Sequence, residues 1–196
     1  MEKTARQLAL GALIVLALVT FMIGQGHKIP ASKCSLPVDS TIVLEYPQGS
    51  AQTTVELKSD PNNVPTVNTN SQNSDKTLDA KFTSLAQTGT INGQTITANL
   101  NPNVPSTGKV TSVQQSSSGD FAKGHHTFNL FLQYTVGGQT FENKTPIKVE
   151  ADIDSTSPSG RTYLMTNGPV QLYDSSNKSK VVATLYKLEN RVQAAP

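Results

Sequence analysis

The sequence is poor in cysteine and has no tryptophan. Cys34 is the single cysteine among 196 residues, so no disulfide can form within the chain and stability must come from a packed core. We expect this thiol either to be idle or to form a bridge to another chain. Because tryptophan is the best surface for stacking a sugar ring, its absence weakens the case for a sugar-binding module.

Charge is also scarce, and no catalytic motif is present. Charged residues make up 15% of the chain, and 16 basic against 14 acidic side chains give a net charge of +2. Nucleic-acid recognition needs a clustered positive surface, and the basic residues form no run, so we expect no nucleic-acid partner. The chain has no G-x-S-x-G elbow and only three histidines. A non-catalytic protein is therefore favoured, and an exported hydrolase with an unspecified carboxylate or metal site remains the alternative.

Long apolar runs are absent except for one near the N-terminus. Residues 8–23 read LALGALIVLALVTFMI and follow Lys3 and Arg6. A basic segment followed by an apolar run is typical of an export signal. It predicts that residues 1–26 are a signal peptide or an N-terminal membrane anchor, with a transmembrane helix over residues 8–23. Residues 27–39 are then expected to be a stalk and residues 40–196 an extracytoplasmic β domain, either membrane-anchored or secreted.

The rest of the chain alternates between apolar and polar residues with the period of a β-strand. The strongest run covers residues 127–136, and a second covers residues 147–154. Asn92-Gly93 and Gly137-Gly138 are dipeptides typical of tight hairpin turns. The pattern predicts an all-β fold: an antiparallel β-sandwich, Ig-like or jelly-roll-like, with a β-barrel as the alternative. Polar stretches predict long loops over residues 59–79, 101–108 and 112–126.

Four residues are weak candidates for a metal site: His125, His126, Asp152 and Asp154. Adjacent side chains of a strand point to opposite faces, so the two histidines are not expected to share one ion. Glu150, Asp152 and Asp154 form a row on one strand face, which is more simply a solvated surface. We therefore assign no catalytic, cofactor-binding or metal-binding residue and expect no cofactor.

These observations predict an exported, membrane-tethered β-sandwich that acts as a non-catalytic binding or structural module of the cell envelope or surface. The partner is an unspecified protein or polysaccharide, and the oligomeric state is open. Because loops on a rigid scaffold often carry recognition, the contacts are expected in the long loops over residues 59–79 and 112–126.

Overall fold

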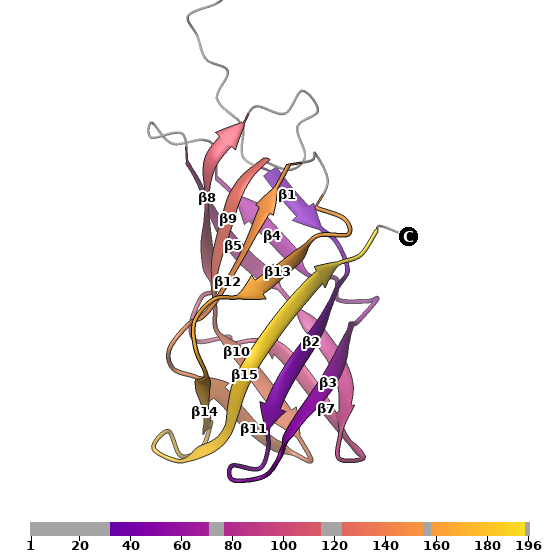
Figure 1. Cartoon of the computed structure of the whole chain (residues 1–196), viewed down its shortest axis with the longest axis vertical. Helices are drawn as coiled ribbons and strands as arrows, with labels where there is room; N and C mark the ends of the chain where they lie inside the picture. The colour runs from indigo at the N-terminus through magenta and orange to yellow at the C-terminus, as the bar shows by residue number, and fades with distance from the viewer. Residues whose placement is uncertain (1–31, 71–76, 115–122, 155–157, 195–196) are drawn as a thin grey trace, which may run out of the picture.

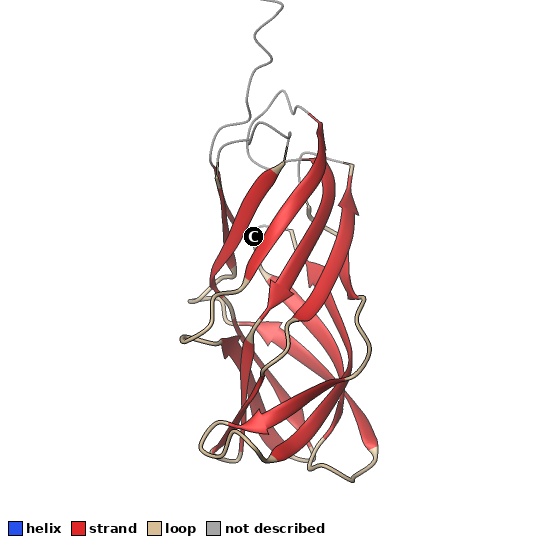
Figure 2. Cartoon of the chain, turned by 90° about the vertical axis from the view of Figure 1, so that its left-hand side faces the viewer, coloured by secondary structure: helices blue, strands red, loops and turns tan. Residues whose placement is uncertain are grey.

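The computed structural model describes residues 32–70, 77–114, 123–154 and 158–194. Every regular secondary-structure element assigned in these residues is a β-strand, so the predicted all-β class is confirmed (Figure 2). Fifteen strands are present in the described part of the chain. Their bounds are β1 Ser32–Ser35, β2 Val38–Glu45, β3 Gln52–Ser59, β4 Thr66–Thr69, β5 Leu78–Ser84, β6 Ala86–Ile91, β7 Gln94–Leu100, β8 Thr107–Gln114, β9 Lys123–Leu130, β10 Leu132–Val136, β11 Gln139–Asn143, β12 Ile147–Ile153, β13 Thr162–Met165, β14 Val170–Asp174 and β15 Val181–Val192.

The strands form one antiparallel barrel with two levels. Strands β2, β3, β6, β7, β10, β11, β14 and β15 follow one another in the sheet, and β15 pairs with β2 to close the ring. The other strands extend the same wall upward in the order β13, β12, β9, β8, β5, β4, β1 (Figure 1). Successive pairs of strands alternate between the lower and the upper level, so the chain runs up and down the barrel as a meander.

Proline marks most of the places where a strand passes from one level to the other. Every interruption longer than one residue contains at least one proline: Pro37, Pro61, Pro65, Pro102, Pro105, Pro146 and Pro169. Proline has no N–H to donate to the hydrogen-bond ladder between strands, so it interrupts the pairing of a strand with its neighbour. The remaining two breaks are the single residues Leu85 and Phe131.

The predicted sandwich is wrong, and the alternative, a β-barrel, is the fold that the structure favours. The pairing of β15 with β2 joins the last described strand to the second one, from Val192 opposite Val38 to Thr184 opposite Glu45. Alternation predicts which side chains face inward, but the inner faces of a sandwich and a barrel read alike. The closing pair therefore decides the architecture.

Several boundaries also differ from the sequence prediction. Residues 32–39 were expected to be a stalk, yet they contain β1 and the start of β2. The expected loop over residues 59–79 contains β4 and the first residues of β5, and the loop over residues 101–108 ends where β8 begins. In the third expected loop, β8 runs to Gln114 and β9 begins at Lys123. These segments are polar because one face of each strand meets water.

The structure does not support the prediction of a membrane protein with a signal peptide and a transmembrane helix. The described residues contain no helix that is long and apolar enough to cross a membrane. Residues 8–23, on which those descriptions depended, lie outside the described residues. An extracytoplasmic location stays a prediction.

The core follows the predicted alternation closely. In β9 and β10 the inward residues are buried and the residues between them are more exposed, and Phe128, Leu130, Leu132, Tyr134 and Val136 all face the interior. Gly108 on β8 permits the closest approach in the upper level. A Cβ atom added there would lie 2.1 Å from the ring of Phe128. Glycine is therefore required where β8 crosses this ring.

Candidate ligand cavity

A cavity of about 50 Å³ lies inside the upper level of the barrel. Its walls are formed by strands distant in sequence, from β1 and β4 to β13 and β15. The lining residues are Cys34, Leu36, Val38, Pro65, Val67, Phe82, Leu85, Phe128, Leu130, Val149, Pro158, Tyr163, Asn190 and Val192. One water needs about 10–15 Å³ and a cavity of about 150 Å³ holds benzene, so this space fits only a molecule of a few heavy atoms. None of these lining residues carries a charge, and most are aliphatic or aromatic.

Polar side chains interrupt the apolar interior along one row, which we call the polar arc: His126, Tyr163, Asn190, Ser40 and Gln87. All five are buried, with exposed fractions between 1% and 7%. The register explains the row, because Tyr163 is opposite Asn190 across β13 and β15, and Asn190 is opposite Ser40 across β15 and β2. Directly opposed residues of neighbouring strands share a face. Tyr163 and Asn190 also line the cavity.

The hydrogen bonds of the polar arc leave one donor group unused. The Nε2 of Gln87 donates to the backbone oxygen of Val38 at 2.5 Å and to Ser40 Oγ at 2.7 Å. Ser40 Oγ has one hydrogen and two acceptors within reach, Asn190 Oδ1 at 2.6 Å and Gln87 Oε1 at 3.0 Å, and the shorter contact is the one to Asn190. Among the described residues, Asn190 Nδ2 has no acceptor. A buried amide group that lines a cavity and lacks a partner can donate to a bound molecule.

The other end of the polar arc is a neutral hydroxyl held by a histidine. Tyr163 Oη lies 3.2 Å from His126 Nδ1. Burial, and then the neighbouring Cys34, raise the pKa of the Tyr163 hydroxyl well above its usual value. Tyr163 is therefore a protonated hydroxyl at neutral pH, and it presents a polar but uncharged group to the cavity.

Cys34 contributes its thiol to the wall of the cavity. It lies on β1 opposite Val67 of β4 and is half-buried. This position could not be predicted from the sequence, since residues 27–39 lack the apolar alternation of the other strands. Because it is the single cysteine of the chain, its thiol is a unique chemical marker of the cavity.

The residues named from the sequence as metal candidates divide between the inside and the outside of the barrel. His125 and Asp152 meet on the outer face, with 2.8 Å between Nδ1 and Oδ1, and Glu150 lies 3.8 Å from Nε2. His126 faces inward toward Tyr163, and Asp154 pairs with Arg161. Among the described residues, no three His, Cys, Asp or Glu side chains are arranged to hold a metal ion.

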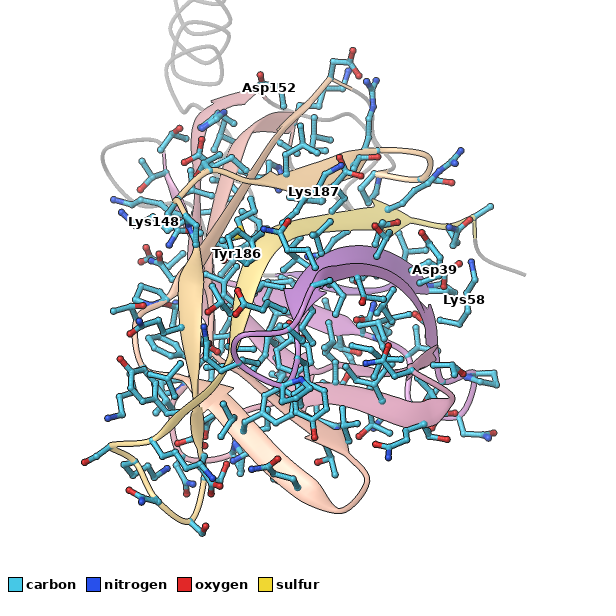
Figure 3. All side chains as sticks on the ribbon, turned by 60° about the horizontal axis from the view of Figure 1, so that its bottom comes forward. Asp39, Lys58, Lys148, Asp152, Tyr186 and Lys187 are labelled. Carbon is cyan, nitrogen blue, oxygen red and sulfur yellow. The ribbon has the colours of Figure 1, made fainter. Side chains whose placement is uncertain are left out.

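The outer face carries charged pairs. Figure 3 shows Asp39 and Lys58 next to each other on β2 and β3, where Lys58 Nζ donates to Asp39 at 2.9 Å. This hydrogen bond, and then the charge of Asp39, raise the pKa of Lys58. Lys58 is largely exposed, so the pair contributes little to stability. It is a surface feature and does not reach the cavity.

Sequence reasoning missed the polar arc, although a signal for it exists. Ser40 is in phase with the buried Ile42 and Leu44, and Asn190 is in phase with Leu188 and Val192. A polar residue in phase with an apolar strand face must find partners inside the protein. Such residues therefore mark an internal site more directly than polar residues in loops.

Comparisons with known proteins support the fold. No family model matches the chain. No curated protein matches it either. Among solved structures, the chain is similar to DynF from the dynemicin biosynthesis pathway of Micromonospora chersina, with a TM-score of 0.70 and 16% sequence identity. The alignment covers 87% of this chain and 86% of that one. The chain is thus an antiparallel β-barrel protein that shares the fold of DynF over nearly its whole length.

Proposed function

We propose that this protein is a non-catalytic binding module that holds a small apolar molecule inside the upper level of its barrel. The observation that carries the proposal is the apolar cavity with the unused amide of Asn190 in its wall. Binding sites for small molecules are mostly apolar, with a few polar groups that fix orientation. The mouths and interiors of β-barrels are frequent places for them.

The interior site replaces the loops as the proposed contact region. The loop prediction depended on long segments without strands, but β4 and the first residues of β5 lie within the first of them. An internal cavity also explains why polar side chains persist at inward positions, where apolar residues would pack without needing partners.

A titration with acetone, a molecule of a few heavy atoms, tests the proposal. Binding is expected to shift the NMR signals of the inward methyl groups and to slow alkylation of Cys34 by N-ethylmaleimide, because the bound molecule covers the thiol in the cavity wall. Since Cys34 is the single cysteine, the alkylation rate reports on this site alone.

A matched pair of variants on β12 locates the binding. Val149 lines the cavity, whereas Lys148, the preceding residue, is exposed on the outer face (Figure 3). Val149→Phe fills the cavity and is expected to abolish binding, while Lys148→Phe is expected to leave it unchanged. Circular dichroism verifies that both variants fold. Binding that survives in Val149→Phe, or no binding to the wild-type protein, contradicts the proposal.

A further inference from the structure

We infer that the ligand is uncharged and carries a hydrogen-bond acceptor, such as a carbonyl oxygen, that meets Asn190 Nδ2. This inference deepens the proposed function and depends on it. It names the chemistry of the ligand, which the presence of an apolar cavity alone does not define.

The first argument is charge. The cavity walls contain no lysine, arginine, histidine, aspartate or glutamate among the described residues. The free energy of moving an ionised carboxylate or ammonium group from water into such a site is unfavourable unless a counter-charge meets it. Tyr163 is protonated at neutral pH, as a tyrosine ordinarily is, and burial raises its pKa further, so it adds no charge either. The site therefore disfavours fatty acids and amines in their ionised forms.

The second argument is the direction of the hydrogen bonds. Along the polar arc the donors point from Gln87 to Ser40 and from Ser40 to Asn190. This order uses the oxygen of Asn190 as an acceptor and leaves its amide hydrogens for the cavity. Asn190 is 7% exposed, and its amide group is not among the fully buried side-chain atoms without a partner. A ligand oxygen beside it gains a hydrogen bond from this donor.

The third argument is orientation. Asn190 is opposite both Tyr163 and Ser40 in the sheet register, so its side chain is held between two neighbouring strands. Its oxygen is fixed by the 2.6 Å hydrogen bond from Ser40 Oγ. A donor fixed in this way selects a ligand by the position of its acceptor. The apolar part of the ligand then lies against residues such as Phe128, Leu130 and Val149.

Three probes of equal carbon number test the inference: acetone, propane and propanoate at pH 7.4. We expect acetone to bind more tightly than propane, and propanoate to bind at least about tenfold more weakly than acetone, because its charge has no partner in the cavity. Equal or tighter binding of propanoate overturns the inference but leaves the proposed function standing. If neither acetone nor propane binds, the proposed function itself fails.

Variants of the polar arc test the role of Asn190. Asn190→Ala and the similarly sized Asn190→Leu are expected to weaken acetone binding about fivefold, which is the effect of one hydrogen bond. Propane binding is expected to stay within about twofold, which shows that the cavity is intact. Ser40→Ala keeps the Asn190 amide but removes the hydrogen bond that fixes its oxygen, so it is expected to reduce the preference for acetone less than Asn190→Ala does. An equal loss for propane and acetone in both Asn190 variants overturns the inference.

Discussion

Two buried tyrosines differ in what their hydroxyl groups contact. Tyr163 Oη lies 3.2 Å from His126 Nδ1, whereas Tyr134 Oη is buried and has no hydrogen-bond partner among the described residues. The ring of Tyr134 stacks on Phe141 at a centroid distance of 5.9 Å in the lower level. The ring of Tyr134 therefore stabilises the core while its hydroxyl remains unpaired.

This difference predicts opposite effects for the same substitution. Tyr134→Phe removes an unpaired buried hydroxyl and is expected to raise the free energy of unfolding by about 1 kcal/mol. Tyr163→Phe removes a hydrogen-bonded hydroxyl and is expected to lower it by about 1 kcal/mol. Urea unfolding of both variants measures the two changes. A loss of stability in Tyr134→Phe equal to that in Tyr163→Phe would show that both hydroxyls are paired.

At the scale of elements, Asn143 bridges a break in the neighbouring long strand. Phe131 separates β9 from β10, and on either side of it the backbone is bonded to this one side chain. The Leu132 N–H donates to Asn143 Oδ1 at 2.7 Å, and Asn143 Nδ2 donates to the Leu130 oxygen at 2.9 Å. Asn143 is 2% exposed, so water cannot replace it. The side chain therefore stands in for the missing part of the ladder.

Asn143→Ala is expected to lower the free energy of unfolding by about 2–4 kcal/mol, because it leaves a buried backbone donor and acceptor without partners. Asn129→Ala, on the exposed face of β9, is the matched control and is expected to change stability by less than about 0.5 kcal/mol. Chemical denaturation measures both. Equal effects of the two substitutions would rule out the bridging role.

A second contact on β11 makes stability depend on pH. Burial acts to raise the pKa of Glu142, but hydrogen bonds from Lys178, Gln133 and Asn101 outweigh it, so the pKa lies below its usual value. A carboxyl group whose pKa is lower in the folded state stabilises the protein above its unfolded pKa. That contribution is lost as the pH falls through the folded value.

Glu142→Gln is therefore expected to be less stable than the wild-type protein at pH 7 and to lose this difference as the pH falls below about 4, where the unfolded carboxyl group is protonated. Lys178→Met removes the charged partner of Glu142 and is expected to reduce the pH dependence of the wild-type protein. Urea unfolding across this pH range provides the test. A stability difference that is constant from pH 7 to pH 3 contradicts the assignment.

The sequence predicts single strands well and their continuation poorly. The run over residues 127–136 was predicted with the correct inward face, because alternation is a local property of the chain. Proline-containing segments such as residues 101–106 were interpreted as ordinary loops, yet they lie between two strands of the same path. Whether a chain turns back or continues after a proline depends on its neighbours. There, Asn101 N and Ser106 Oγ both donate to the Phe131 oxygen.

At the scale of the whole molecule, neither the closure of the barrel nor the cavity could be predicted from the sequence, and the reason is the same for both. Both depend on contacts between segments far apart in the sequence: β15 pairs with β2, and the cavity wall includes Cys34 and Val192. Periodicity gives no information about such distant pairs. The two levels then differ in their interiors, because the lower level is filled by large side chains such as Tyr134 and Phe141, whereas the upper level retains the cavity.

Two leucines separated by the break at Phe131 distinguish the two levels. Leu130 lines the cavity in the upper level, and Leu132 is buried in the lower core. Replacing either with alanine is expected to lower the free energy of unfolding by about 2–5 kcal/mol. Leu130→Ala also enlarges the cavity, so it is expected to bind a ketone longer than acetone, 2-pentanone, more tightly than the wild-type protein does. Leu132→Ala is expected to leave that affinity unchanged, because the space it creates lies outside the cavity. Calorimetric titration of both variants gives the affinities, and an equal gain for both would show that the two levels share one interior space.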